Sequence, residues 1–183
     1  MNSTELKIVF TGPMGAGKTT AINQISDEPC VSTEVANNDF QQCGKDTTTT
    51  GLDYGYIRLP DGNGVRLYGT PGQERFRFMW SIIANNAAGI ILLLNGDHPE
   101  LEHHLALYLD AFATTQPLPL VIGVGRLPDN DFQIIDALHK QLASRNQPLP
   151  VIPIDVRDRE DVLLLVDTLL AQIEASNLEF AHG

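Results

Sequence analysis

Leu6-Lys7-Ile8-Val9-Phe10 is a short apolar run, and soon after it the chain reads Gly12-Pro13-Met14-Gly15-Ala16-Gly17-Lys18-Thr19-Thr20. The run predicts a buried strand and the segment after Gly17 predicts a helix, so the glycine-rich loop lies between them. There, backbone N–H groups and the helix N-terminus can surround a polyphosphate. Lys18 is placed to reach the β- and γ-phosphates, and the Thr19 hydroxyl to bind Mg²⁺. The stretch from Gly12 to Thr20 therefore predicts a nucleotide-binding loop.

Composition and charge narrow the class of protein. The chain has 183 residues, 12 of them Lys or Arg, and a formal net charge of −11. Contacts to nucleic-acid phosphates need clustered basic side chains, so no nucleic-acid partner is expected. Cys30 and Cys43 lack the spacing of a metal site and fit reduced thiols in the cytoplasm. We expect a single cytoplasmic domain over residues 1–183, with no leader, transmembrane segment or lipid anchor.

Strand-like and helix-like patterns alternate along the chain. Strands are expected at 6–10, 57–59, 65–68, 87–94, 118–124 and 151–154, and helices at 17–26, 75–86, 100–114, 131–145 and 160–175. This order predicts a three-layer α/β fold with helices on both faces of the sheet. The turn composition of 60–64 joins the second and third strands as an antiparallel hairpin. The predicted sheet has six strands, five parallel and one antiparallel at an edge.

A second motif follows the third expected strand, Gly69-Thr70-Pro71-Gly72-Gln73-Glu74-Arg75-Phe76. With the preceding loop, it resembles the Ras-like small GTPases, particularly the Rab and Arf branches. Pro71 makes it most similar to the bacterial small GTPases of cell polarity and multicomponent signalling, which include the gliding-motility type. The resemblance implies a Ras-like P-loop fold, GTP and GDP as ligands, Mg²⁺ as cofactor, and a small roadblock/longin-type protein as activator or co-complex member.

Three residues carry the switch chemistry that this resemblance implies. The backbone N–H of Gly72 can bind a γ-phosphate and lose that contact on hydrolysis. Gln73 is placed to orient the attacking water. In the run Thr47-Thr48-Thr49-Thr50, the family pattern selects Thr49 as the ligand of Mg²⁺ and the γ-phosphate, with Thr48 and Thr50 as alternatives.

The metal-binding side of the pattern is incomplete. Related proteins begin the second motif with an Asp that holds Mg²⁺ through a water, whereas this chain has Gly69. Either Asp53 or Asp46 is a possible substitute. We expect weaker Mg²⁺ binding than is usual in the family, with more of the triphosphate affinity coming from Lys18 and the loop backbone.

The base-binding side also departs from the family. The expected Asn-Lys-x-Asp is replaced by Gly125-Arg126-Leu127-Pro128, with Asp129 one place late. Arg126 can stack its guanidinium over a base. Asp129 either reaches the base or, with its neighbours, caps the next helix. A later backbone contact to the base is expected at Val156. Guanine preference is thus implied by the resemblance alone.

Residues near the γ-phosphate suggest slow turnover. Met14 stands where many relatives have glycine, and its side chain is expected to crowd Gln73 and the attacking water. The resemblance places a first switch segment between Lys18 and Arg58, where Lys45 is the only basic residue. Because this first switch lacks an arginine, Arg75, Arg77 or a partner would supply the positive charge.

Two further groups of side chains lie outside the phosphate motifs. The apolar residues from Phe76 to Trp80 are expected to form core or, where exposed, a docking face for an activator or effector. His103 and His104 are expected to be solvated helix residues with no metal role.

The sequence therefore predicts a GTP-binding switch with weak GTP hydrolase activity that regulates a bacterial signalling or polarity complex. One alternative is a non-hydrolysing pseudo-GTPase that serves as a docking module, favoured by Gly69 and the altered base motif. The other is an ATP-dependent small-molecule kinase, which the phosphate loop alone would equally suit.

Overall fold

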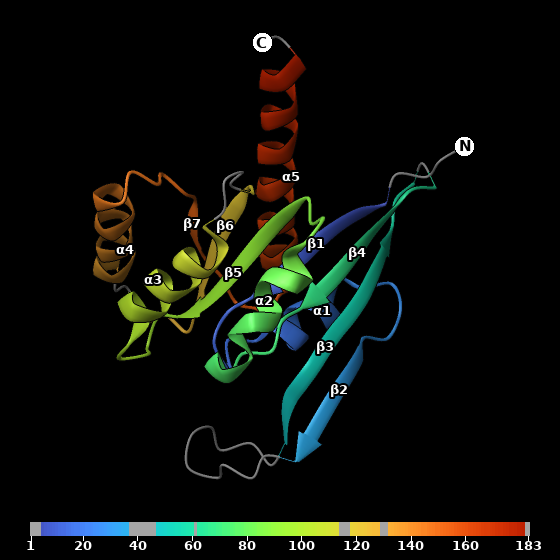
Figure 1. Cartoon of the computed structure of the whole chain (residues 1–183), viewed down its shortest axis with the longest axis horizontal. Helices are drawn as coiled ribbons and strands as arrows, with labels where there is room; N and C mark the ends of the chain where they lie inside the picture. Colours follow the sequence, from blue (N-terminus) through green and yellow to red (C-terminus); the bar gives the residue numbers. More distant parts are fainter. Residues whose placement is uncertain (1–4, 37–46, 61, 114–117, 129–131, 182–183) are drawn as a thin grey trace.

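The computed structural model describes residues 5–36, 47–60, 62–113, 118–128 and 132–181, and side chains within these ranges except those of 33–36, 47–51 and 177–181. These residues form a three-layer α/β fold around one mixed sheet of seven strands (Figure 1). Across the sheet the strands are β2 (Val31–Ala36), β3 (Thr47–Arg58), β4 (Gly64–Gly69), β1 (Leu6–Thr11), β5 (Gly89–Asn95), β6 (Leu120–Gly125) and β7 (Val151–Pro153).

The sheet has one strand more than the six we expected. The additional strand, β2, lies at the edge and pairs antiparallel with β3, which is itself antiparallel to β4. The five parallel strands are as predicted, but the antiparallel strand β3 is inside the sheet and not at its edge. An edge strand is paired on one side only and tolerates polar residues. The mixed sequence of 31–36 therefore gave no clear apolar signal.

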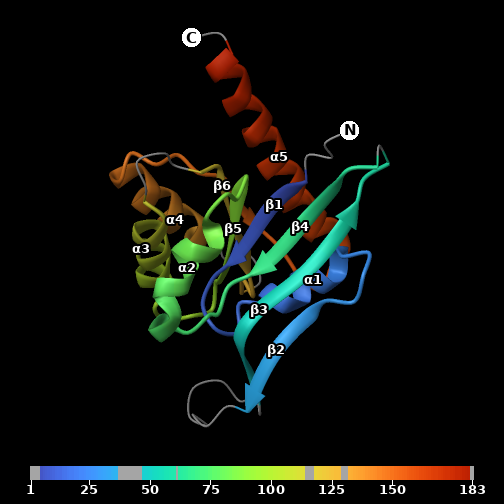
Figure 2. The ribbon, with the colours of Figure 1, turned by 45° about the vertical axis from the view of Figure 1, so that its right-hand side comes forward.

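Helices cover both faces of the sheet. On one face α1 (Lys18–Ile25) packs beside α5 (Arg159–Ala181). On the other lie α2 (Arg77–Ala84), α3 (Leu101–Phe112) and α4 (Phe132–Ser144), with a short 3₁₀ turn η1 (Glu74–Phe76) leading into α2 (Figure 2). Among the described helices, none combines the length and apolarity needed to cross a membrane.

The central strands divide their side chains between two cores. On β5, Ile91 and Leu93 pack in the cluster that includes α1 and α5. Ile90 and Leu92 pack in the cluster formed with α2, α3 and α4. All four side chains are essentially fully buried. The alternation follows from the two-residue period of a strand, and it explains why β5 is a continuous apolar run.

The parallel strands all end at the same edge of the sheet. The loops after β1, β4, β5, β6 and β7 therefore gather there, as in other open α/β sheets that bind ligands at this edge. These loops contain the phosphate loop, the Gly72–Gln73 segment and Arg126. The topology thus brings most of the predicted functional residues to one end of the molecule.

Candidate nucleotide-binding site

The phosphate loop joins β1 to α1 in a conformation that requires glycine. Gly12 has φ 141°, and Gly15 and Gly17 also have positive φ angles. A Cβ added to Gly12 would lie 2.1 Å from the backbone oxygen of Leu93 on the adjacent strand. Because backbone atoms cannot easily move aside, Gly12 is fixed by both its dihedral angle and its close approach to β5.

Lys18, at the start of α1, folds back over the loop. Its Nζ donates hydrogen bonds to the backbone oxygens of Gly12 at 2.7 Å and Pro13 at 2.8 Å. The side chain is only 7% exposed. The fold therefore holds a buried positive charge against the phosphate loop, where it can neutralise an anion bound by the loop N–H groups.

The next residue, Thr19, contacts a buried carboxylate from β3. Its Oγ1 donates a 2.6 Å hydrogen bond to Oδ2 of Asp53, whose side chain is fully buried. Within the described part of the chain, Asp53 Oδ1 has no hydrogen-bond partner. A buried carboxylate oxygen without a partner is costly. Hydroxyl and carboxylate oxygens are also the ligands that Mg²⁺ prefers, so these two residues fit that ion.

Gly69 leaves room for this carboxylate. Asp53 on β3 and Gly69 on β4 are directly paired across the sheet. A Cβ at Gly69 would lie 2.9 Å from both Cβ and Oδ2 of Asp53. The Asp53 side chain on the neighbouring strand therefore fills the space that a side chain at position 69 would occupy. Of the two substitutes that the sequence left open, Asp53 is beside Thr19, while Asp46 lies outside the described residues.

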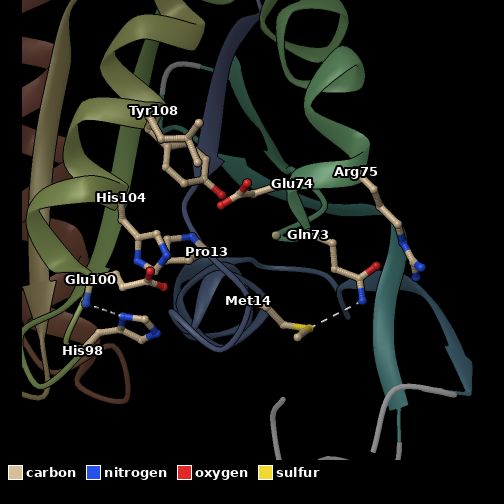
Figure 3. Close-up of a pocket in the computed structure, with 11 residues that line it drawn as sticks. Pro13, Met14, Gln73, Glu74, Arg75, His98, Glu100, His104 and Tyr108 are labelled. Atoms are coloured by element: carbon tan, nitrogen blue, oxygen red, sulfur yellow. Dashed lines mark hydrogen bonds between the residues drawn. The ribbon is translucent and has the colours of Figure 1, made fainter. Parts of the chain in front are cut away.

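The segment after β4 packs on the phosphate loop. A Cβ at Gly72 would lie 2.6 Å from the backbone nitrogen of Met14 and 2.8 Å from Lys18 Nζ. Gln73 Nε2 donates to the Met14 sulfur at 3.7 Å, and Gln73 Oε1 is buried without a hydrogen-bond partner among the described residues. Figure 3 shows Met14 and Gln73 pointing toward each other. The Met14–Gln73 contact expected from sequence is thus present.

A cavity of about 730 Å³ lies at the other end of the phosphate loop. It is lined by Gly15, Ala16, Gly17, Thr20, Asn95, Gly125, Arg126, Leu127, Pro153, Ile154, Asp155, Val156, Arg157 and Asp161. Arg126 is exposed with φ 51°, and a Cβ at Gly17 would lie 2.7 Å from Val156 Cγ2. Side-chain hydrogen bonds from Arg157 lower the pKa of Asp155 to about 2, so this carboxylate is charged at neutral pH.

Of some predicted site residues, the structure describes the backbone alone or nothing. Thr49 belongs to β3, with its backbone opposite Glu34 of β2, but its side chain and those of Thr48 and Thr50 lie outside the described residues. Asp129 lies outside them altogether. The choice among the threonines and the role of Asp129 stay as the sequence left them.

The expected docking segment is divided between surface and core. Trp80 is fully buried, donates a 2.7 Å hydrogen bond to the Pro71 oxygen and stacks on Tyr108. Phe78 is 65% exposed, and Ile82 one turn later on α2 is 69% exposed. Trp80 therefore anchors the Gly72–Gln73 segment to α3, while Phe78 and Ile82 form an apolar ridge on the surface.

No protein-family model matches the chain. Over 177 residues, 93% of this chain and 79% of the relative, it is 26% identical to GTP-binding protein YPT1 of Saccharomyces cerevisiae. It is also 32% identical over 79 residues to an uncharacterized protein of Methanocaldococcus jannaschii. That match spans 43% of this chain and 44% of the archaeal protein.

Solved structures resemble the chain in fold. The small GTPase Arl6 BBS3 of Trypanosoma brucei, solved with the nucleotide analogue GppNp, aligns with TM-score 0.67 and 16% identity over 94% of this chain and 99% of that one. Era of Aquifex aeolicus aligns with TM-score 0.64 and 14% identity over 84% and 52%. Bacterial elongation factor EF-Sec aligns with TM-score 0.61 and 17% identity over 91% of this chain but only 29% of its own. This chain has the α/β fold of the P-loop GTPases.

Proposed function

We propose that this protein is a GTP-binding switch with slow GTP hydrolysis that regulates a signalling or polarity complex in a bacterium. The observation that carries the proposal is the arrangement of Lys18, Thr19 and Asp53 beside the glycine-rich loop. A triphosphate and its Mg²⁺ need a cation, a hydroxyl and a carboxylate, and the carboxylate here has an oxygen without a partner among the described residues. The similarity to YPT1 and to the Arl6 structure supports guanine nucleotides as ligands.

Each residue has a separate task in this proposal. The loop N–H groups and Lys18 bind the phosphates, and Thr19 and Asp53 hold Mg²⁺, with Thr49 as the further ligand that the resemblance implies. When bound, Mg²⁺ would supply positive charge that neutralises the phosphates. Gln73, whose Oε1 has no partner in the described residues, orients the attacking water. Gly72 contacts the γ-phosphate and is released when it leaves.

The experiment that tests this function compares fluorescent GTP and ATP with the nucleotide-free protein in Mg²⁺. We expect GTP to bind at least tenfold more tightly, which corresponds to about 1.4 kcal/mol. Arg126→Ala should weaken both nucleotides if this side chain stacks on the base. Equal affinities would contradict guanine selectivity. No binding of either nucleotide would instead favour the pseudo-GTPase docking module that the altered base motif suggests.

Met14 provides a second prediction, about the rate of hydrolysis. Its side chain lies against Gln73, whose Nε2 donates to its sulfur, and its bulk fills space that the attacking water needs beside the glutamine. We expect Met14→Gly to raise the single-turnover hydrolysis rate by roughly tenfold, within the range that small misplacements at a reacting centre cost. Met14→Leu, of similar size, is the control and should stay slow. An unchanged rate in Met14→Gly would contradict the crowding argument.

We propose that a small roadblock/longin-type partner docks near the segment from Phe76 to Trp80, with Phe78 and, just beyond that segment on α2, Ile82 as its main contacts. The two side chains are exposed and adjacent on α2, next to the segment that senses the γ-phosphate. Exposed apolar ridges of this kind are typical of protein interfaces. The partner can also supply the arginine missing from the first switch.

A further inference from the structure

A cluster of two histidines and a glutamate lies beside the phosphate loop, outside the residues used above. His98 and Glu100 belong to the loop after β5, and His104 lies in the first turn of α3. Together with Pro13, Met14 and the Gly72–Arg75 segment, they line a cavity of about 600 Å³. Figure 3 shows the three side chains gathered on the α3 side of this cavity, opposite Met14 and Gln73.

The ligand atoms of the cluster are close enough together to converge on one metal ion. One ligand atom from each of the three residues lies within 4.8 Å of the others. In a tetrahedral zinc site, bonds of ~2.0–2.1 Å place ligand atoms roughly 3.3 Å apart, so modest side-chain rotations would close the cluster on an ion. His104 is 9% exposed and its ring lies 4.5 Å from that of His98.

The local fold gives His98 a ring nitrogen that acts as an acceptor. Its Nδ1 accepts a 3.1 Å hydrogen bond from the backbone N–H of Glu100. That bond requires an unprotonated Nδ1, which is the form of histidine that binds metals. A metal on this nitrogen would replace the hydrogen bond. The backbone oxygen of Glu100 accepts from the N–H of His104, so the three residues are also joined through one helical turn.

We propose that His98, Glu100 and His104 form a binding site for a divalent transition-metal ion, with Zn²⁺ as the preferred ion. Two imidazoles and a carboxylate favour zinc over Mg²⁺, which prefers all-oxygen ligands. The site is therefore chemically different from the Thr19–Asp53 pair.

The position of the site suggests that the metal acts on the switch. Glu74, in the segment that follows Gln73, is exposed and lines the same cavity, and Figure 3 shows its carboxylate directed toward Tyr108. The Tyr108 hydroxyl is buried without a hydrogen-bond partner among the described residues. Glu74 is outside the three-residue cluster, so an ion held by His98, Glu100 and His104 would place its positive charge on the wall of the cavity that the Gly72–Arg75 segment also lines.

The test is a calorimetric titration of Zn²⁺ into the full chain, freed of metals by a chelator and then kept in excess Mg²⁺. We expect one ion to bind, and His98→Ala and Glu100→Gln each to weaken it by about tenfold or more. Glu100 is exposed, so Glu100→Gln tests the site even if a histidine variant fails to fold. His103→Ala is the matched control, since His103 is the exposed neighbour of His104 and lies outside the cluster.

The visible absorption of bound Co²⁺ provides a second readout, because its bands report a nitrogen-containing site of low coordination number. We expect these bands in the wild-type chain and in His103→Ala, and their loss in His98→Ala. Wild-type affinity for Zn²⁺ in both His98→Ala and Glu100→Gln would overturn the proposal. A loss of Zn²⁺ affinity in His103→Ala equal to that in the cluster variants would also overturn it.

Discussion

Asp53→Asn is expected to weaken Mg²⁺-dependent binding of the triphosphate by about 10- to 100-fold, the range typical when a group that supports a metal is lost. Asn keeps the shape of the side chain and can still accept from Thr19, but it removes the negative charge from a fully buried site. Titrating Mg²⁺ at fixed fluorescent GTP measures the effect. Asp110→Asn is the control, because Asp110 is an exposed carboxylate on α3 paired with Arg145.

Exchanging the two paired residues gives a sharper test of the same idea. In the double variant Asp53→Gly, Gly69→Asp, the carboxylate moves from β3 to the paired position on β4, where the resemblance places it. We expect this variant to recover Mg²⁺ affinity to within about tenfold of the wild type. Gly69→Asp alone should lose affinity, because its Cβ would meet Asp53 at 2.9 Å.

The results of the single and double variants distinguish a metal-binding role of Asp53 from a structural one. If Asp53→Asn binds Mg²⁺ as the wild type does, Asp53 holds no metal, even if the nucleotide binds. If Asp53→Asn is weak but the exchange does not recover, the carboxylate is needed at β3 for another reason, such as anchoring Thr19. Circular dichroism of each variant shows whether a loss of binding is a loss of fold.

The sequence predicted the α/β layers because β1, β5 and β6 are buried on both faces and are continuous apolar runs. It missed β2 because an edge strand of mixed composition has little apolar periodicity. The turn at 60–64 predicted the β3–β4 hairpin correctly, and β3 also extends back to Thr47. Strands buried on both faces were readable from their apolar runs, while the edge strand was not.

The site was predictable where one contiguous motif forms it. The loop from Gly12 to Thr19 is such a motif, and so is Gly72–Gln73. The partner of Thr19 was narrowed only to Asp53 or Asp46, because Asp53 is distant in sequence and becomes its neighbour only through the pairing of β3 with β4. His98 and His104 were missed for a similar reason. Their spacing matches no metal motif, and a loop and a helix turn bring them together with Glu100.

Gly72→Ala is expected to separate nucleotide binding from hydrolysis. The new Cβ would lie 2.6 Å from the Met14 nitrogen and 2.8 Å from Lys18 Nζ, so the segment must move away from the phosphate loop. Gln73 moves with it, and a displacement of ~1 Å at a reacting centre costs about 100-fold in rate. We expect single-turnover GTP hydrolysis to fall by about that factor, with a smaller change in GDP affinity, since GDP lacks the γ-phosphate.

Gly125→Ala is the matched control for this variant. A Cβ at Gly125, the last residue of β6, would find its nearest atoms at 3.7 and 3.9 Å, which is ordinary contact. Gly125 lines the cavity on the base side and not the γ-phosphate side, so in a single turnover this variant should hydrolyse GTP that is already bound at the wild-type rate. If Gly72→Ala also does, the segment does not control turnover and Gln73 acts from another position. If instead Gly72→Ala loses GDP and GTP affinity equally, its Cβ acts through Lys18 and the loop, because a switch that senses the γ-phosphate must distinguish the two nucleotides.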